Sequence, residues 1–406
     1  MSVRERFLKY ISIHTTSDPE HESITPSSES QFQLAKILYD ELVEMGASDV
    51  YLDEHCYVYA TIPAAAGCEN SPVIAFLAHM DTAPDFPGEN VCPQIIPDYS
   101  GENVKLGDSG LTLRVDEMPH LPALRGRTLI TTDGTTLLGA DDKAGIAEIM
   151  EAAEHLLRNE VSHGTVRICF TPDEEIGNGV KYIDLDRLNA DFGYTLDGGP
   201  EGEVVYENFN AAEAEIEIRG KNIHPGDAKG LMINAALAAM EFNSMLPSGQ
   251  IPSQTEKYEG FYHLTHISGD VSNAKLGYII RDHNAGSFEA KKETLIHITK
   301  LLNEKYGAGT FTLQLTDQYR NMEECIRPHM QLIENAMKAT KKAGALPHTE
   351  PIRGGTDGAN LSWMGLPCPN LGTGGYAFHG PYEHITVEGM EACVRIVLAL
   401  VSSFAS

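Results

Sequence analysis

Apolar runs that alternate with amphipathic helix patterns through the first two hundred residues constrain the fold of this 406-residue chain. Buried-strand runs occur at Val73–Leu77, Val166–Phe170 and Gly193–Leu196. Helix patterns cover about residues 28–46, with Ser28 as the N-cap, and about residues 143–159. Fully apolar strands interleaved with helices are typical of a central sheet covered on both faces. The sequence therefore predicts an α/β domain.

The pattern changes at about residue 211. Ala212–Arg219 alternates strictly between small or apolar and charged residues, which predicts a strand with one buried face. A helix at 232–246, strands at 260–268 and 275–282, a helix at 287–306 and the strand Phe311–Leu315 follow. This βαββαβ order is that of a small ferredoxin-like domain. Helices at 328–343 and 387–404 close the chain. We expect one domain from residues 1–210 and 320–406, and an inserted domain from residues 211–319.

Composition limits the partners and the compartment. The chain is 42% hydrophobic, enough for a full core, and its formal net charge of -28 argues against nucleic acid or an anionic membrane surface as a partner. Solubility explains this charge, and attraction of a substrate ammonium group is the alternative. The seven cysteines form no C-x-x-C pair, and the first residues contain no apolar leader segment. We expect a soluble cytoplasmic protein with free thiols.

Histidine and carboxylate side chains follow the ends of the predicted strands. Ligands gather at the carboxyl ends of strands in sheets of this kind. One further aspartate opens a predicted helix, and one further histidine lies in a glycine-rich loop near the C-terminus. The set consists of His79, Asp81, Asp141, Glu174, Glu175, Asp197 and His379.

Two imidazoles and several carboxylates are the ligands that a pair of hydrolytic metal ions requires. Zinc accepts both groups, and one aspartate can bridge two ions through its two oxygens. Asp81 lies two residues after His79 on an extended segment, so it can hold the imidazole in one tautomer. Glu174 and Glu175 are adjacent, so both reach one site only through irregular backbone. One would bind metal, and its neighbour would accept a proton from water.

Each segment also has a simpler explanation. A lone His-x-Asp pair is commonly structural, acids at a helix start such as Asp141 are commonly caps, and Asp197 could be a turn residue. Glu174 and Glu175 could be solvated loop acids, and His384 competes with His379. The combination favours a metal site, because without one all of these separate structural explanations would have to be true at once. No H-E-x-x-H, G-x-S-x-G or Walker motif is present, and no helix pattern follows the glycine-rich run at 372–377.

Several motifs together resemble those of the M20 family of di-zinc peptidases and deacylases. They are His79-Met-Asp81, Gly139-Ala-Asp-Asp-Lys-Ala-Gly145, Asp173-Glu-Glu-Ile-Gly177 and the late His379. The resemblance covers essentially the whole chain, including the inserted domain, and is strongest to the tripeptide aminopeptidases of the family. Its most specific marks are Thr195–Glu203, Ile223–Gly230 and Arg353–Asn360. We find no departure from the ligand pattern of the family.

The resemblance implies a mixed-sheet catalytic domain with an inserted lid or dimerisation domain, and two Zn²⁺ per subunit, with Co²⁺ or Mn²⁺ as alternatives. It implies that Asp141 bridges the two ions and is followed by a cis peptide bond. The remaining implied roles are His79 and Asp197 on one ion, Glu175 and His379 on the other, Glu174 as general base, and Asp81 as the residue that orients His79.

The resemblance also implies three residues that contact the substrate. His224 would polarise the scissile carbonyl, in some relatives from the neighbouring subunit of a dimer; the alternative is a surface histidine before Pro225. Arg281 and Arg353 would clamp a substrate carboxylate, because a guanidinium donates two parallel hydrogen bonds. Either arginine could instead form a structural ion pair, Arg281 with Asp282 especially.

The function that the resemblance implies is release of the N-terminal residue from tripeptides. The alternative is another amide hydrolase of the same architecture: a dipeptidase, a carboxypeptidase or an N-acyl amino acid deacylase. A non-catalytic metal-binding or peptide-binding protein would have lost the base or a ligand, and none is lost here. The alternating segment Glu215–Ile218 offers an edge strand through which a homodimer would form.

Overall fold

The computed structural model describes residues 1–405, which form two units. The first contains Met1–Tyr206, Glu324–Glu350 and the chain from Thr356 onward; the second contains Glu207–Glu323 and Pro351–Gly355. The second unit thus begins earlier and ends later than the inserted domain expected at 211–319. It also includes a short returning segment that the sequence-based division assigned to the first domain.

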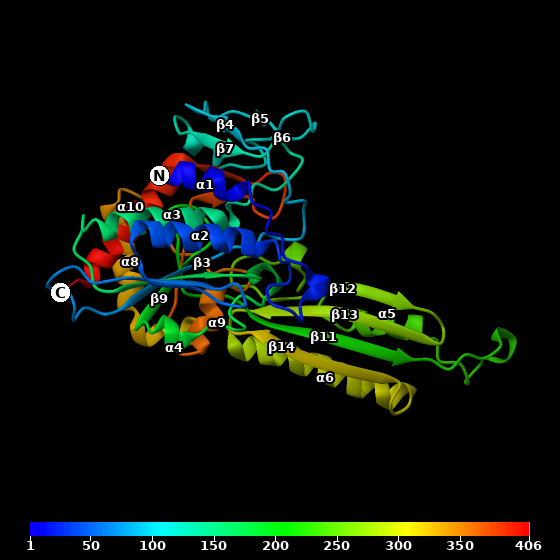
Figure 1. The fold of residues 1–406 in the computed structure, drawn as a ribbon. Helices are drawn as coiled ribbons and strands as arrows, with labels where there is room; N and C mark the ends of the chain where they lie inside the picture. Colours follow the sequence, from blue (N-terminus) through cyan, green and yellow to red (C-terminus); the bar gives the residue numbers. More distant parts are fainter. Residues whose placement is uncertain (406) are drawn as a thin grey trace. The chain divides into compact units, whose positions relative to one another are not determined.

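A seven-stranded mixed sheet forms the centre of the first unit (Figure 1). Its four inner strands run parallel, and antiparallel strands complete both edges. The three apolar runs of the sequence are the inner strands β3, β8 and β9, which confirms the predicted α/β mixed sheet. In sheet order the strands are β1 (Ser48–Leu52), β2 (Val58–Ile62), β8 (Val166–Thr171), β3 (Ile74–His79), β9 (Phe192–Leu196), β15 (Asn370–Leu371) and β10 (Val204–Val205).

Helices cover both faces of this sheet. Figure 1 shows α1 (Val3–Ile11), α2 (Gln31–Met45), α3 (Ala140–Leu157) and α10 (Val387–Phe404) on one side, and α4 (Leu185–Leu188) and α9 (Asp357–Trp363) on the other. On the α4 and α9 side, Leu77 and Cys169 of the strands form a buried core with Leu188 and Leu361 of the helices. The remaining helices are α7 (Glu323–Ile326) and α8 (Gln331–Lys342), and α8 packs on α10.

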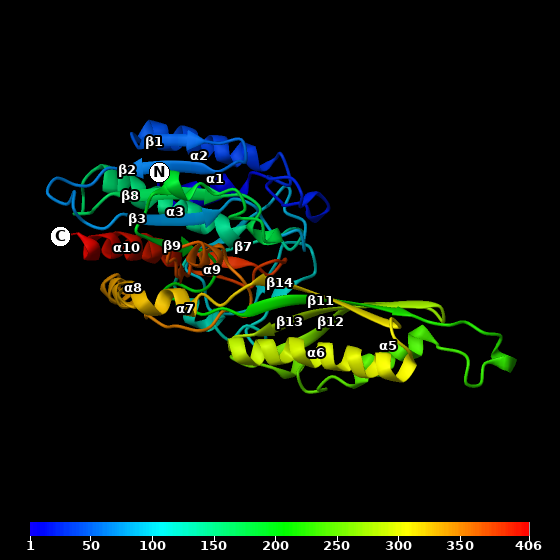
Figure 2. The same ribbon diagram turned by 90° about the horizontal axis from the view of Figure 1, so that it is seen from below.

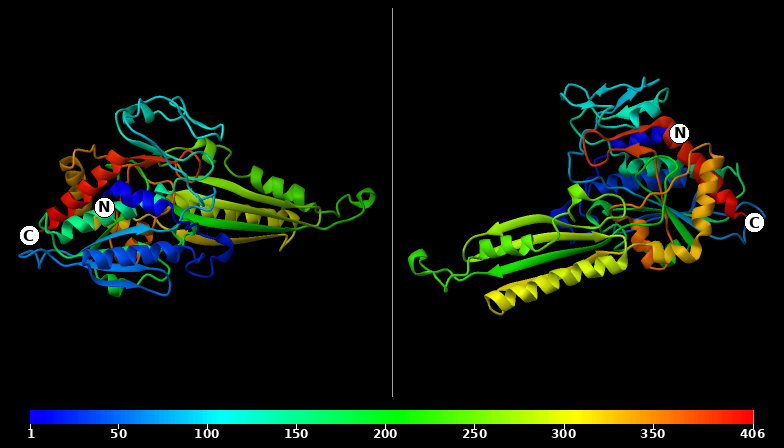
Figure 3. Two further views of the ribbon diagram at one scale, coloured as in Figure 1. Left: turned by 45° about the horizontal axis from the view of Figure 1, so that its top comes forward. Right: turned by 180° about the vertical axis from the view of Figure 1, so that it is seen from behind.

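A second, smaller sheet joins the middle of the chain to its C-terminal part. Its order is β16 (Gly375–Tyr376), β17 (His384–Thr386), β7 (Leu129–Thr131) and β4 (Gln94–Ile96). A two-stranded sheet of β5 (Val104–Lys105) and β6 (Thr112–Leu113) lies near it, in the cyan part of Figure 3. Because β17 pairs with β7, the loop between β16 and β17 is brought close to the chain that leads from β7 into α3.

The second unit has the order β11 (Asn210–Arg219), α5 (Ala235–Ser244), β12 (Phe261–Gly269), β13 (Asn273–Asp282), α6 (Ala285–Tyr306) and β14 (Phe311–Tyr319). This is the βαββαβ order predicted from the sequence. Figure 2 shows α5 and α6 on one face of the four-stranded sheet. Ile216 and Ile218 of β11 form a buried core there with Phe242 of α5 and Leu295 of α6.

The position of β11 corrects one prediction. The sheet order is β12-β13-β11-β14, so β11 is hydrogen-bonded to a strand on each side. The segment Glu215–Ile218 therefore offers no free edge, and the edge-strand argument for a homodimer is wrong. The alternating pattern correctly predicted one buried and one solvated face. Inner and edge strands of such a sheet both have this pattern, so it does not identify an edge strand.

One predicted helix start differs in the structure, and another is confirmed. The helix expected from Ser28 begins at Gln31, because the Ser28 hydroxyl donates to the carbonyl of Thr16 instead of capping the helix. The helix expected from residue 143 is confirmed, because Asp141 and Asp142 at the start of α3 have non-helical backbone angles, with ψ of 103° and 34°, and regular helix follows them. Short 3₁₀ helices lie at Pro19–His21, Leu121–Leu124, Glu174–Ile176, Pro225–Asp227, Pro252–Gln254 and Arg327–His329. No helix among residues 1–405 combines the length and apolarity needed to cross a membrane.

Candidate metal centre

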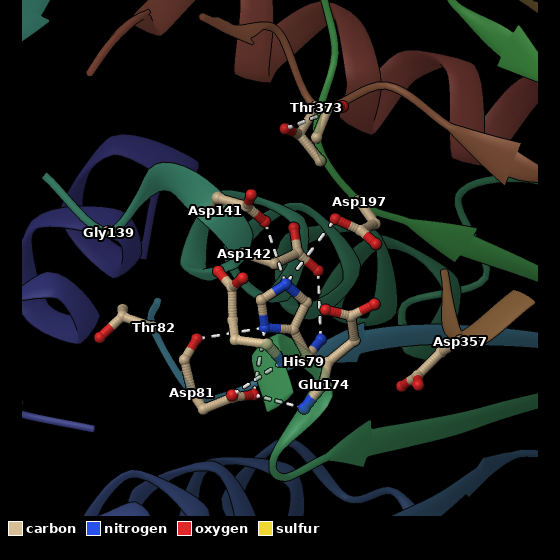
Figure 4. A network of polar contacts seen from close by, with 12 residues as sticks. His79, Asp81, Thr82, Gly139, Asp141, Asp142, Glu174, Asp197, Asp357 and Thr373 are labelled. Atoms are coloured by element: carbon tan, nitrogen blue, oxygen red, sulfur yellow. Dashed lines mark hydrogen bonds and ion pairs between the residues drawn. The ribbon is translucent and has the colours of Figure 1, made fainter. Parts of the chain in front are cut away.

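His79 is the last residue of β3, and its buried ring lies between carboxylates (Figure 4). Its Nε2 atom lies 3.0 Å from Asp141 Oδ1 and 3.7 Å from Asp197 Oδ1. On the other side of the ring, Nδ1 lies 3.1 Å from the carbonyl oxygen of Asp81 and 3.3 Å from its Oδ1. The ring is thus oriented by Asp81 and presents Nε2 to two acidic side chains, which is the geometry expected of an imidazole ligand.

A second group of side chains forms around His379. Its Nε2 atom lies 3.1 Å from Glu175 Oε2 and 3.4 Å from Asp141 Oδ2. His379 lies in the loop between β16 and β17, whereas Glu175 follows β8. Residues far apart in the sequence therefore meet here through the pairing of the small sheet and the order of the large one.

Asp141 belongs to both groups. Its Oδ1 faces His79, and its Oδ2 faces His379. In each group of three residues, one potential ligand atom per residue lies within 4.8 Å of the others. Ligand atoms about 2.0–2.1 Å from a tetrahedral ion are roughly 3.3 Å apart, close to the distances seen here. The arrangement fits two neighbouring cations that share one aspartate.

The backbone of the acidic loop is irregular, as the adjacent glutamates require. Asp173 has a left-handed φ of 54°, and a 3₁₀ helix follows at Glu174–Ile176. The two carboxylate oxygens of Asp81 accept the N–H groups of Glu174 and Glu175, at 3.0 and 3.1 Å. Figure 4 shows the Glu174 side chain extending from the Asp81 side of His79 towards Asp197. Asp81 therefore positions both the imidazole and the acidic loop.

The buried carboxylate of Asp173 fixes the first residue of this loop. It accepts hydrogen bonds from the Ser27 N–H at 2.7 Å, the Ser27 hydroxyl at 2.6 Å and the Gln31 amide at 2.7 Å. Ser27 lies in the segment that leads into α2, and Gln31 is the first residue of that helix. Of the three acids at 173–175, the first is thus structural, and only the two that follow face the histidines.

The start of α3 brings Asp141 close to the end of β9. The peptide bond between Asp141 and Asp142 is cis, as the resemblance implied. Asp142 is turned inward, where its Oδ2 accepts the N–H of His79 at 3.1 Å. A methyl group on Gly145 would overlap the carbonyl oxygen of Leu196 and lie 2.6 Å from Asp142 Oδ1. Gly145 is therefore needed for this close approach of helix and strand.

Crowding of acids around the histidines shifts the acid–base equilibria. Burial disfavours charge on Asp141, but hydrogen bonds with His379 and His79 outweigh it and hold the pKa of Asp141 well below its usual range. Hydrogen bonds with Asp141 and Glu175 raise the pKa of His379 to about 11. Burial, together with the charge of Asp141, raises the pKa of Glu175 to about 7. Burial and nearby carboxylates also raise the pKa of Glu174 well above normal.

The donor set fits divalent metal ions. Five carboxylates, those of Asp81, Asp141, Glu174, Glu175 and Asp197, lie around only two imidazoles, and a bound cation would balance their negative charge. Glu175 Oε1 is buried and has no hydrogen-bond partner among the described residues. A buried carboxylate oxygen without a partner is costly unless it coordinates a metal. Mixed nitrogen and oxygen ligands suit zinc and similar ions.

Comparison with known proteins identifies the family of this chain. The model of peptidase family M20/M25/M40 matches residues 132–403. Peptidase T of Clostridium perfringens is 52% identical over 405 residues, which is 99% of each chain. The chain belongs to the M20/M25/M40 peptidase family. Two solved structures share its fold, each at a TM-score of 0.79. Aminopeptidase PepT of Bacillus cereus is 24% identical in sequence, and the match covers 100% of this chain and 98% of that one. A tripeptidase of Staphylococcus aureus is 22% identical, and the match covers 99% of this chain and 98% of that one.

Family membership supports a metal cofactor at this cluster, and the geometry decides between the two candidate histidines. The ring of His384 is turned away from the acids: its Nδ1 donates to the carbonyl of Tyr382 at 2.7 Å, and its Nε2 lies 2.8 Å from His120 Nε2. His379, and not His384, therefore faces Glu175 and Asp141.

The remaining predicted residues lie in the second unit. His224 is the N-cap of the 3₁₀ helix Pro225–Asp227, in the loop that extends from one end of the sheet of that unit (Figure 3). Its side chain is 80% exposed, and its Nδ1 accepts the N–H of Gly226 at 3.2 Å. A neutral histidine that accepts at Nδ1 carries its proton on Nε2. Nε2 is therefore the donating nitrogen.

The two arginines have neutral acceptors in that unit. Arg281 donates to the carbonyls of Ala212 and Ile280 and to the amide oxygen of Gln318. Arg353 donates to backbone carbonyls at 255, 257 and 259 and thereby fixes this segment. The ion pair considered between Arg281 and Asp282 is not formed; instead Asp282 pairs with Lys291 at 3.0 Å.

Sequence reasoning missed three buried acids that support the centre. Asp173 entered the sequence analysis only as the first residue of the motif Asp173–Gly177, with no role of its own. Asp357 accepts a hydrogen bond from the hydroxyl of Thr171, the last residue of β8, at 2.8 Å. Glu383 accepts backbone N–H groups just before α3 and at its start. In the sequence, Asp357 and Glu383 are each visible only as an acid within a glycine-rich segment. Such a segment does not indicate which distant group the acid binds.

Proposed function

We propose that this protein is a metal-dependent aminopeptidase that releases the N-terminal residue from tripeptides. The observation that carries the proposal is Asp141, whose two oxygens face His79 and His379 separately. Its relatives support the substrate class: one is named peptidase T, and the solved structures are an aminopeptidase and a tripeptidase.

The metal ligands in this proposal are His79 and Asp197 for one ion, Glu175 and His379 for the other, and Asp141 for both. Two Zn²⁺ per subunit would occupy them, with Co²⁺ or Mn²⁺ as alternatives. Bound at this place, the ions would supply Lewis-acid activation of water and of the scissile carbonyl. Elemental analysis of protein purified without chelator tests this, with two equivalents of zinc expected. A single equivalent would contradict the paired site.

Glu174 is the proposed general base. It accepts a proton from the attacking water and delivers it to the leaving amine. Its backbone is fixed by Asp81, and its side chain extends towards Asp197, so it lies beside the ligands without belonging to either group of three. A positioned proton acceptor contributes about 10²–10⁴ in rate.

His224, Arg281 and Arg353 are the proposed substrate contacts of the second unit. The protonated Nε2 of His224 can donate to a carbonyl oxygen, and loss of such a donor costs about 10²–10³ in turnover. Arg281 and Arg353 both present a positive charge whose acceptors are neutral oxygens. Separate glutamine variants distinguish them. Only the variant of the true clamp should lose the preference for a free over an amidated C-terminus.

A panel of free, N-acetylated and C-amidated forms of one tripeptide tests the reaction. We expect rapid release of the first residue from the free form and no cleavage of the acetylated form. Preferential cleavage of the acetylated form would favour a deacylase, and release of the last residue would favour a carboxypeptidase. Thorough chelation should abolish activity, and Zn²⁺ should restore it. Activity that survives chelation would exclude the mechanism.

A homodimer formed through the second unit, in a reducing cytoplasm, completes the proposal. Strand β12 is at the end of its sheet, and Leu237 and Met240 of α5 are each 62% exposed. The described cysteines are free thiols, which supports the compartment. Sedimentation equilibrium tests the assembly, and we expect a particle of twice the monomer mass. The double variant Leu237→Glu and Met240→Glu should sediment with the mass of a monomer.

A further inference from the structure

The carboxylate of Glu383 is bound by three backbone N–H groups from a distant part of the chain. Its Oε2 accepts from Leu138 at 2.6 Å and from Gly139 at 2.8 Å, and its Oε1 accepts from Asp141 at 3.0 Å. Glu383 is 1% exposed. Two donors lie just before α3 and the third is the second residue of α3, so both carboxylate oxygens are used on this one short segment.

These N–H groups need an acceptor from elsewhere. Leu138 and Gly139 precede α3, and Asp141 has non-helical backbone angles, so the regular turns of the helix that follows do not satisfy these three N–H groups. Glu383 provides the missing acceptor from a different loop. A negative charge at a helix N-terminus is also favoured by the helix dipole.

The loop that holds Glu383 also carries His379. It connects β16 to β17, and β17 pairs with β7, with His384 opposite Thr131. Within the loop, the Thr132 hydroxyl donates to the carbonyl of Pro381 at 3.0 Å, and the N–H of Glu383 donates to the carbonyl of Gly380 at 3.3 Å. The same loop therefore places the His379 imidazole beside Asp141 and Glu175 and, through Glu383, binds the backbone N–H of Asp141.

We propose that Glu383 is a positioning residue for the metal centre, which fixes the backbone of Asp141 relative to His379 so that both oxygens of Asp141 face their histidines. The inference rests on the proposed metal-dependent function. A glutamine at this position would keep one oxygen but direct an amide N–H at a backbone N–H. Asp141 would lose its support without losing its own side chain.

Purely structural helix capping is the competing explanation, and a matched variant separates the two. Glu41 is also a buried glutamate of the first unit, with hydrogen bonds from Lys9 Nζ and Tyr10 Oη, both at 2.7 Å. Glu41→Gln should lower the thermal stability but leave metal binding unchanged. Glu383→Gln should weaken metal binding beyond any loss of stability.

The experiment measures the dissociation constant for Zn²⁺ by competition with a chromogenic chelator, using the full chain stripped of metal and refilled. Loss of a side chain that supports a ligand typically weakens metal binding 10- to 100-fold, and we expect this for Glu383→Gln. Glu41→Gln should change the constant by less than about twofold. The visible spectrum at saturating Co²⁺ should also shift for Glu383→Gln and not for Glu41→Gln.

Glu383→Asp provides the second variant if the glutamine variant does not fold. It keeps both acceptors but shortens the side chain by one methylene, so we expect binding intermediate between wild type and the loss predicted for glutamine. Wild-type affinity and an unchanged cobalt spectrum in either folded Glu383 variant would overturn the proposal, as would equal weakening by Glu41→Gln. If the wild-type protein itself binds no metal, the proposed function fails instead.

Discussion

The Oδ1 atom of Asp81 accepts the backbone N–H of Glu174 at 3.0 Å, and the same oxygen lies 3.3 Å from Nδ1 of His79. One carboxylate therefore fixes the residue proposed as general base and orients a proposed metal ligand. The Oδ2 atom extends this support to the N–H of Glu175. The position of the proposed base relative to the proposed metal ligands is thus set by a side chain that belongs to neither group of three.

Replacing Asp81 with Asn should lower kcat/KM by about 10- to 100-fold, because an amide loses one acceptor and directs an N–H at the acidic loop. Steady-state kinetics with a tripeptide measure the effect. Asp53→Asn is the control, since Asp53 also accepts two backbone N–H groups, from His55 and Tyr57. Equal losses in both variants would refute a specific role for Asp81.

Glu174→Gln should reduce kcat by about 10²–10⁴ while the affinities for zinc and for peptide stay close to those of the wild type. The amide keeps the shape of the side chain but cannot accept the proton. Turnover, metal content and peptide binding are measured on the same preparation. Substantial turnover in a fully metallated variant would mean that another group is the base.

Gly145→Ala should destabilise the protein by about 1–3 kcal/mol, because the added methyl would overlap the carbonyl oxygen of Leu196 at the approach of α3 to β9. Urea unfolding of the metal-free protein provides the measurement. Gly249→Ala is the control, since a methyl there would meet only Gln254 Oε1, at 3.7 Å. A neutral Gly145→Ala variant would show that the helix can move away without cost.

The stability of the metal-free protein should fall on acidification through His384. Burial lowers the pKa of His384 to about 4, below its ordinary value of 6.5. The unfolded chain therefore binds a proton at higher pH than the folded chain does. Stability present above about pH 6.5 is lost as the pH falls towards 4, by about 2 kcal/mol between pH 7 and pH 5.

Urea unfolding of wild type and His384→Asn at several pH values tests this. The variant, which has no group to protonate, should lose about 2 kcal/mol less than wild type over that interval. Burial also lowers the pKa of His120, whose Nε2 lies 2.8 Å from that of His384, so His120→Asn should reduce the slope as well. Parallel slopes for wild type and His384→Asn would exclude His384 as the source.

Local patterns were sufficient where burial is uniform or strictly periodic. The inner strands β3, β8 and β9 are apolar along nearly their whole length because helices cover both faces of the sheet. The alternation of β11 similarly reported its one buried face. It did not report the place of β11 in the sheet, because hydrogen bonds to neighbouring strands leave no mark on the side-chain pattern.

By itself, the sequence determined the α/β character, the βαββαβ order of the second unit and the types of residue in the metal centre, since periodicity and side-chain chemistry are local properties. Only the tertiary structure shows which contacts place His379 rather than His384 beside Asp141, a choice that the family resemblance had implied, and that Glu383 binds the backbone at the start of α3. Those outcomes depend on strand pairing and buried hydrogen bonds between residues more than two hundred positions apart. Contacts over such distances are fixed by the packing of the whole chain.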